Sequence, residues 1–311
     1  MSETDELFEE HRPALARLAY RMLGSLADAE DVLQDAYLRW ARDGRQAVQS
    51  PRAYLLTIVT RLCIDQRHSI EARKMKYVGP WLPEPVVEPV GLGPGAPLET
   101  AESVSMALLL VLESLSPVER AAYLLRRIFD YDYDTIARIL DKSEPSCRQL
   151  VSRAEQRIHE RRPRFDPDPV QAERLTDAFL EACSTGDLNG LVQILASDAI
   201  MYSDGGGKAA AALAPIRGAE KIARFFIGIM KKVPSRMEGR RVRVNGQPGL
   251  VITVDGQLIQ VLTLDVADGR IANCFVVRNP DKLARVGKTW EDESPCEPTT
   301  NAGSGGASPS R

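Results

Sequence analysis

Cysteine and histidine are scarce in this sequence of 311 residues, which has five cysteines and three histidines. The cysteines are odd in number and scattered without a CxxC pair, and the histidines stand alone. A disulfide framework needs paired cysteines, and a zinc site needs cysteine or histidine ligands at short spacing. We therefore expect neither, and we expect no metal and no cofactor.

Long apolar runs are also missing. The longest, residues 106–112 and 222–230, are too short or too interrupted to span a bilayer. The N-terminus, MSETDELFEEH, lacks the basic and then apolar pattern of a secretory signal. The sequence therefore predicts a cytoplasmic protein with no membrane partner.

An excess of positive charge, common in proteins that hold DNA unaided, is absent, because the net charge is −3. Residues 1–35 hold nine acidic and three basic side chains, whereas 52–76 hold six basic against two acidic and 142–164 hold seven against three. Two basic segments in an acidic chain predict DNA contact at two places. We expect this binding to be weak unless a partner supplies most of the phosphate contacts.

The segment 134–158 is typical of two short helices joined by a tight turn. Ser143 is placed as the N-cap of the second helix, and Pro145 falls in its first turn, where a missing N–H costs little. One face of this second helix is apolar and consists of Cys147, Leu150, Val151, Ala154 and Ile158. The pattern predicts a helix-turn-helix, although spacing alone fits a solvated helical hairpin equally well.

The opposite face of the second helix carries side chains suited to DNA. They are Ser146, Arg148, Gln149, Ser152, Arg153 and Arg157. Arginine can bind guanine and glutamine can bind adenine with two hydrogen bonds each, whereas hydroxyls and a helix N-terminus suit phosphate. This face therefore combines base reading with phosphate anchoring.

The segment 28–40 predicts an amphipathic helix with one clean apolar face. A second stripe on the same helix is formed by Asp31, Gln34, Asp35 and Leu38. By spacing alone a solvated acidic stripe is the simpler interpretation, and a docking surface is the alternative. The next predicted helix, 52–68, is apolar nearly all round and should be buried in a helical bundle, with Arg61 and Asp65 at its far end.

Three ordered segments resemble the two conserved domains of extracytoplasmic-function sigma factors of bacterial RNA polymerase. They are DAEDVLQDAYLRW (28–40), SPRAYLLTIVTRLCIDQRHS (50–69) and the stretch 112–158. The resemblance implies an alternative sigma factor that directs promoter-specific initiation of transcription. Residues 1–77 would form sigma domain 2, for core polymerase and the minus-10 element, and residues 103–164 would form sigma domain 4, for the minus-35 element.

Residue roles follow from the same resemblance. The stripe Asp31, Gln34, Asp35 and Leu38 would dock on the beta-prime clamp of core RNA polymerase, with the beta flap as a second contact. The minus-10 element would be read and melted by Val48, Arg52, Tyr54, Arg61 and Asp65. The minus-35 element would be read by Ser146, Arg148, Gln149, Ser152 and Arg153. Core polymerase would supply the affinity for promoter DNA that the acidic balance lacks.

The segment 78–102 is rich in proline, a composition that favours extended chain over helix. Fully extended, this linker would reach about 75 Å, enough for two domains to span two promoter elements. Within it the sequence WLPEP places Trp81 among prolines. Because an exposed indole is costly, we expect Trp81 to dock on another part of the protein or on a partner.

Residues 169–286 predict helices followed by an antiparallel meander. A helix ends near Ser184, a second follows Gly186-Asp187, and a strand at 199–203 precedes a helix at 219–231. Four strands follow, separated by the hairpin dipeptides Asn245-Gly246, Asp255-Gly256 and Asp268-Gly269. The order gives an α+β cone whose curved antiparallel sheet can wrap a pocket. Residues 287–311 are expected to be disordered.

This order of elements resembles the SnoaL-like polyketide cyclase and ketosteroid-isomerase fold. The motifs YSDGGGK (202–208) and NPDKL (279–283), with WLPEP, further resemble the sigma-factor subgroup that carries such an extension, the SigJ type. The resemblance implies that the extension regulates the sigma domains, with no dedicated anti-sigma factor. The regulatory contacts would come from Trp81, Leu82, Pro83, Glu84, Pro85, Asp204, Gly205, Gly206, Gly207, Lys208, Asn279, Pro280, Asp281 and Lys282.

Two alternatives remain open at this point. The extension could be an enzyme with Asp204 or Asp281 as general base, but no His, Tyr or second acid at informative spacing supports a proton-transfer pair, so we expect no enzyme. The chain could instead be a one-component DNA-binding regulator whose cone binds a small apolar ligand. The acidic stripe 31–35 argues against this second alternative, since such a sensor has no use for a polymerase-docking surface.

Overall fold

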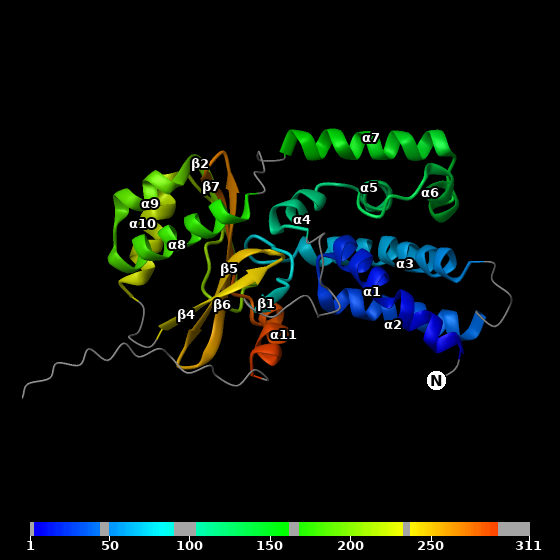
Figure 1. Ribbon diagram of the computed structural model, residues 1–311, viewed down its shortest axis with the longest axis horizontal. Helices are drawn as coiled ribbons and strands as arrows, with labels where there is room; N and C mark the ends of the chain where they lie inside the picture. The colour runs from blue at the N-terminus through cyan, green and yellow to red at the C-terminus, as the bar shows by residue number, and fades with distance from the viewer. Residues whose placement is uncertain (1–2, 44–49, 90–103, 162–167, 233–236, 292–311) are drawn as a thin grey trace, which may run out of the picture.

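The computed structural model describes residues 3–43, 50–89, 104–161, 168–232 and 237–291 (Figure 1). The expected minus-10 residue Val48, most of the linker (90–102) and the tail from residue 292 lie outside these ranges. A search of the described helices finds none with the length and apolar character that crossing a bilayer requires.

The first helical domain is a bundle of three helices. They are α1 (Glu3–Leu23), α2 (Leu26–Asp43) and α3 (Pro51–Lys74). The Ser50 hydroxyl accepts a hydrogen bond from the Ala53 amide at 3.3 Å and caps α3, with Pro51 in its first turn. The predicted apolar face of α2 is buried, and α3 is longer than the predicted 52–68 because it continues to Lys74.

The second helical domain contains the predicted helix-turn-helix. Its helices are α4 (Met106–Leu112), α5 (Pro117–Arg127), α6 (Tyr133–Leu140) and α7 (Glu144–Arg161). Asp141 ends α6 in the left-handed region with φ 54°, and the Ser143 hydroxyl accepts from the Ser146 amide at 3.4 Å as the expected N-cap of α7. The predicted apolar face of α7 is buried, from Cys147 to Ile158.

The two helical domains pack directly on each other. Leu18 and Leu55 of the first domain and Leu124 and Ile136 of the second belong to one continuous buried core. Helix α3 contacts α5 and α6, and α1 contacts α5. In Figure 1 helix α7 lies outermost, at the top of this helical half. The arrangement is therefore closed, although the linker has the length to separate the domains.

The C-terminal domain follows the predicted order of elements. Its elements are α8 (Pro169–Thr185), α9 (Leu188–Ile194), β2 (Leu195–Asp204), β3 (Ile216–Arg217), α10 (Ala219–Met230), β4 (Met237–Val244), β5 (Gln247–Val254), β6 (Gln257–Ala267), β7 (Arg270–Val277) and α11 (Pro280–Glu291). All three predicted hairpin turns are present, with Asn245, Asp255 and Asp268 at φ of 52°, 50° and 49° and a glycine of positive φ after each. Helix α11 continues to Glu291, beyond residue 286, so the first part of the expected tail is helical.

The sheet differs from the predicted antiparallel meander in one respect. Strands β4 to β7 are antiparallel neighbours as expected, but β2 pairs in parallel with β7, so the sheet is mixed. Turn dipeptides fix only the pairing of strands that follow each other in the chain, whereas β2 reaches β7 from far away in the sequence. Strand β2 is also longer than the predicted 199–203.

A further strand comes from the linker between the helical domains. Residues Val87–Pro89 form β1, which pairs antiparallel with β4 and places Val87 opposite Val244. One face of the sheet is covered by α8, α9 and α10, through side chains such as Phe179 and Ile222. The other face packs on α11, on Leu82 of the linker and on Met106 of α4. The sheet thus lies between its own helices and the sigma-like half of the chain (Figure 1).

Candidate functional site

Asp204, the last residue of β2, is the centre of the contact between the linker and the C-terminal domain. It is fully buried, and its Oδ1 accepts a hydrogen bond from the Tyr77 hydroxyl at 2.6 Å. Its Oδ2 accepts from the Leu82 amide at 2.8 Å and forms an ion pair with Lys282 at 2.6 Å. Leu82 and Lys282, two of the predicted contact residues, therefore meet at the carboxylate of a third, Asp204. Tyr77 binds the same carboxylate, although no motif in the sequence indicated it.

The glycine loop after Asp204 allows the other segments to approach. Gly206 has φ 61°, and a Cβ there would lie 2.3 Å from Nδ2 of Asn279, while a Cβ on Gly205 would lie 2.2 Å from a backbone oxygen. Gly207, with φ 71°, packs against Val78 of the linker. A residue with a side chain would clash at Gly205 and Gly206. Glycine therefore permits the close packing that the motif predicted.

The NPDK segment holds the glycine loop from the other side. The Asn279 side-chain amide donates to the Tyr77 hydroxyl at 2.7 Å, and Pro280 begins α11. Asp281 forms an exposed ion pair with Lys208, with distances of 2.6 and 2.8 Å from Nζ to its two oxygens. The YSDGGGK and NPDK motifs thus bind each other as well as the linker.

The Trp81 indole is packed between two lysines from different domains. Nζ of Lys74, on α3, lies 3.2 Å from the ring centroid, and Nζ of Lys282, on α11, lies 4.3 Å from it. The ring also lies against Gly24, where a Cβ would be 2.8 Å from a ring carbon. As expected for an indole that is costly to expose, Trp81 is docked within the protein.

Glu84 of the linker caps helix α2. Its Oε2 accepts from the Leu26 amide at 2.8 Å, and its backbone amide donates to the Gly24 carbonyl oxygen at 2.9 Å. Burial raises the pKa of Glu84, against the opposing effect of the amides of Leu26 and Ala27 and of Arg285. Leu82, Pro83 and Pro85 are buried beside it, so the WLPEP sequence is enclosed between the first helical domain and the sheet.

Asn245 is a contact residue that the sequence indicated only as a turn. Its side-chain amide donates to the Tyr20 hydroxyl at 2.8 Å, and that hydroxyl donates to the Glu84 carbonyl oxygen at 2.8 Å. The Asn245 backbone amide also donates to the Val86 carbonyl oxygen at 2.8 Å. The β4–β5 hairpin thus binds both α1 and the linker, and burial raises the pKa of Tyr20.

Glu113, after α4, joins the two helical domains and was also missed. Its carboxylate pairs with Arg67 at 3.0 Å and Arg120 at 2.7 Å, and it accepts a hydrogen bond from Lys74. Burial alone would raise the pKa of Glu113, but the three cations lower it to about 2. Burial lowers the pKa of Lys74 to about 7, against the opposing effect of Glu113.

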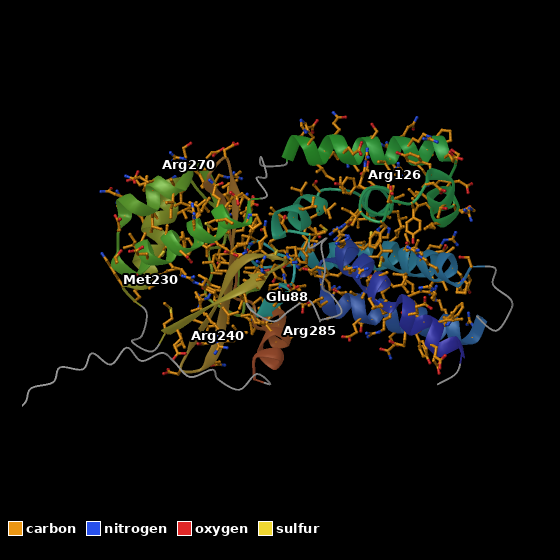
Figure 2. All side chains as sticks on the ribbon, viewed as in Figure 1. Glu88, Arg126, Met230, Arg240, Arg270 and Arg285 are labelled. Atoms are coloured by element: carbon orange, nitrogen blue, oxygen red, sulfur yellow. The ribbon has the colours of Figure 1, made fainter. Side chains whose placement is uncertain are left out.

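The predicted polymerase-docking stripe is exposed. The side chains Asp31, Gln34, Asp35 and Leu38 lie on the surface of α2, with 59% of Leu38 exposed. The C-terminal helix borders this stripe, since Arg285 of α11 forms an ion pair with Glu30. Figure 2 shows Arg285 near β1, at the boundary between the C-terminal domain and the helical half.

Two of the predicted minus-10 residues, the exposed arginines Arg52 and Arg61, contact the second helical domain. The Arg61 Nε donates to the Ile139 carbonyl oxygen of α6 at 3.2 Å, and the Arg52 guanidinium lies 5.6 Å from the centroid of Tyr131. Tyr54 packs against Trp40 with centroids 6.0 Å apart, and Asp65 is exposed. Two of these four side chains are therefore engaged with the other domain.

The predicted minus-35 residues lie on the free side of α7. Arg148, Gln149, Ser152 and Arg153 are exposed, and Ser146 is partly buried in the first turn. Arg148 is oriented by an ion pair with Glu144 at 2.9 Å and by the Tyr133 ring, whose centroid is 4.3 Å away. This surface of α7 is therefore open to solvent.

Comparison with known proteins agrees with this division. Residues 7–73 match the family model for Sigma-70 region 2, and residues 105–158 match the model for Sigma-70, region 4. The ECF RNA polymerase sigma factor SigJ of Mycobacterium tuberculosis is 35% identical over 288 residues, which cover 89% of this chain and 92% of that protein. The probable ECF RNA polymerase sigma factor SigI of the same organism is 30% identical, covering 88% and 92%.

The similarity extends to the fold of all three domains. The crystal structure of Mycobacterium tuberculosis extracytoplasmic function sigma factor SigJ superposes with a TM-score of 0.74 at 32% identity, covering 89% of this chain and 97% of that chain. The predicted two helical sigma domains and α+β extension are thereby confirmed. The chain therefore belongs to the extracytoplasmic-function sigma factors, the initiation factors that bind core RNA polymerase and promoter DNA.

Proposed function

We propose that the C-terminal domain of this sigma factor holds the two sigma domains in a closed arrangement. This arrangement leaves the minus-35 surface free and engages two arginines of the minus-10 surface, Arg52 and Arg61, with the second sigma domain. The observation that carries the proposal is the hydrogen bond from Arg61 to the Ile139 carbonyl oxygen. Arg61 is exposed, but it must give up this hydrogen bond before its guanidinium can turn to a promoter strand. Initiation then requires α6 to leave α3.

Movement of the second sigma domain is coupled to the linker and through it to the C-terminal domain. The linker contributes β1 to the sheet, Leu82 to the buried contact with Asp204, and Glu84 to the cap of α2. Helix α4 of the second sigma domain packs on the same sheet through Met106. The proposed role of the C-terminal domain is thus to set how easily the sigma domains separate, in place of a separate anti-sigma protein.

The proposed role of this domain is regulatory and not catalytic. Asp204, the first candidate for a general base, is fully buried and bonded to Tyr77, Leu82 and Lys282. Asp281, the second, is 63% exposed and forms an ion pair with Lys208 on the surface. A general base must reach a substrate proton in a site that favours proton transfer, and both carboxylates are committed to docking contacts instead.

Core polymerase is proposed to bind the stripe Asp31, Gln34, Asp35 and Leu38 through its beta-prime clamp, with its beta flap on the second sigma domain. The full chain with Asp31→Arg and Asp35→Arg is expected to bind core polymerase at least about tenfold more weakly, because like charges across an interface repel. Promoter-specific transcripts in a purified system should fall in proportion. Both side chains are exposed, so folding should be unchanged.

The control for this double variant is Glu181→Arg with Asp198→Arg, which changes the net charge equally at exposed positions of the C-terminal domain. It should transcribe as the parent chain does. Equal loss in the two double variants would show that net charge, and not the α2 stripe, governs activity. Full activity of the α2 variant would refute the proposed polymerase contact.

The closed chain without polymerase is expected to bind a minus-35 duplex but not a single strand carrying the minus-10 element. Arg148→Ala should weaken binding to the duplex by about 1–3 kcal/mol, the usual value of one good contact to a base. Arg224→Ala is the control, because Arg224 is an exposed arginine of α10 in a similar ion pair, with Glu220. Fluorescence anisotropy at fixed salt measures both, and tight binding of the minus-10 strand would contradict the closed arrangement.

A further inference from the structure

A cavity of about 250 Å³ lies where three parts of the chain meet. Its walls come from the turn between α1 and α2, from the end of α3, from the linker and from the start of α11. Lys74, Tyr77, Trp81, Asn279 and Lys282 line it, and its other charged residues are Asp28, Arg73, Glu84 and Asp281. The volume is that of a small organic molecule, and none of the residues predicted to bind DNA or polymerase lines the cavity.

Lys74 differs from the other cations around this cavity. It shares the Glu113 carboxylate with Arg67 and Arg120, which are 1% and 0% exposed, so three cations crowd one acid. Lys282 of α11 lies on the same indole, and Glu71 of α3 pairs with Arg67 at the exposed edge. A guanidinium does not release its proton in proteins, whereas an ammonium does. Lys74 is therefore the group through which this crowded cluster can lose a positive charge.

We propose that Lys74 is an amine nucleophile that condenses reversibly with small aldehydes entering the cavity. The lone pair of neutral Nζ attacks the carbonyl carbon and forms a carbinolamine. The carbinolamine oxygen then leaves as water with both hydrogens of the amine, so that amine and aldehyde give an imine and one water. The protons that move in these steps are exchanged with solvent in the cavity, because the cations around Glu113 hold the pKa of that carboxyl too low for it to act as the base.

The surroundings of Lys74 favour this reaction at neutral pH. The side chain is 18% exposed, so a reagent in the cavity can reach it, and it lies against the Trp81 ring. Burial lowers the pKa of Lys74 from 10.5 to about 7, which raises the neutral fraction of this amine at neutral pH far above that of an exposed lysine. Ile70 and the aromatic rings on the cavity wall suit the hydrocarbon part of a small aliphatic aldehyde.

An imine at Lys74 would loosen the contact between the sigma domains. The unprotonated imine nitrogen has no hydrogen to donate to Glu113, so one of the three cationic partners of that carboxylate is lost. The added carbon chain must also fit between α3, the linker and α11. Small aldehydes would thus be a chemical class to which the closed arrangement responds.

The test compares Lys74 with Lys76, an exposed lysine two residues away that is recovered in the same peptide. The full chain is incubated at pH 7 with propanal and cyanoborohydride, which reduces the imine to a stable secondary amine, and each lysine is quantified by mass spectrometry after cleavage at acidic residues. An amine with the ordinary lysine pKa of about 10.4 is less than about one part in a thousand neutral at pH 7. Lys74 has the larger neutral fraction, but a less basic amine is also a weaker nucleophile, which offsets part of this advantage. We expect Lys74 to be labelled at least about tenfold faster than Lys76.

Two further measurements make the result specific to the folded protein. In urea the preference for Lys74 should vanish, because the cluster that crowds it is lost. In the native chain the labelling rate at Lys74 should level off above about pH 8, whereas the rate at Lys76 should continue to rise. Equal labelling of the two lysines in the native chain, or a preference that persists in urea, would overturn the proposal.

Discussion

Replacing Asp204 with alanine is expected to release the linker from the C-terminal domain. The substitution leaves the Lys282 ammonium buried without its carboxylate and removes the acceptor of the Tyr77 hydroxyl and the Leu82 amide. Removing one partner of a buried ion pair costs about 3–5 kcal/mol. Hydrogen exchange at the Glu84 and Val86 amides, which donate to the Gly24 carbonyl oxygen and to Asn245 Oδ1, should therefore be faster by about two to four orders of magnitude. Minus-10 binding by the free chain should increase.

A matched control exists in the same site. Asp281→Ala removes an aspartate–lysine pair of the same 2.6 Å length, but this pair is 56% and 63% exposed, so its loss should cost less than about 1 kcal/mol. Equal exchange rates in the two variants would mean that burial of Asp204 does not hold the linker. Faster exchange in Asp204→Ala without any gain in minus-10 binding would instead show that docking of the linker does not control minus-10 binding.

Local chemistry explains why much of the fold could be predicted from the sequence. The Asn-Gly and Asp-Gly dipeptides specify hairpins because both residues of the turn need positive φ, which Asn245 and Gly246 adopt at 52° and 71°. The period of apolar residues in α7 specifies its buried face and hence the face left for DNA. In both cases the residues that carry the pattern lie within a few positions of the structure that they specify.

Contacts between distant segments carried no such signal. Prolines at 80, 83, 85 and 89 favoured extended chain over helix but indicated no pairing partner. Val87 and Glu88 pair with the edge of β4, and Pro89 falls at the end of the strand. Asn245 has a local role in its turn that hides its bond to Tyr20, 225 residues away. The WLPEP and glycine motifs were recognisable as contact segments, but the carboxylate and ammonium groups that join them depend on the packing of three domains.

The contacts form one connected set. Glu113 of the second sigma domain binds Lys74 of the first, Lys74 and Lys282 share the Trp81 ring of the linker, and Lys282 binds Asp204 of the C-terminal domain. If Glu113 or Asp204 is lost, the lysine that it binds, Lys74 or Lys282, loses its carboxylate partner. The position of the second sigma domain and the docking of the C-terminal domain should therefore depend on each other.

Glu113, at the other end of this connected set of contacts, is the site of the second large expected effect. Glu113→Gln is expected to destabilise the chain by about 3–5 kcal/mol, because Arg67, Arg120 and Lys74 then remain buried around a neutral group. Glu71→Gln is the control, since Glu71 pairs with Arg67 at 3.4 Å and is 46% exposed, and its loss should cost less than about 0.5 kcal/mol. Urea unfolding measured by circular dichroism distinguishes the two.

The pH dependence of stability tests whether charge is the cause. The folded chain holds the pKa of Glu113 at about 2 against an ordinary 4.5, so its contribution is present above pH 4.5 and lost as the pH falls through about 2. At 1.36 kcal/mol for each pKa unit the loss amounts to about 3 kcal/mol. The parent chain should therefore lose this amount more than Glu113→Gln between pH 4.5 and 2. If both lost stability equally, Glu113 would contribute through packing, and the cations around it would not depend on its charge.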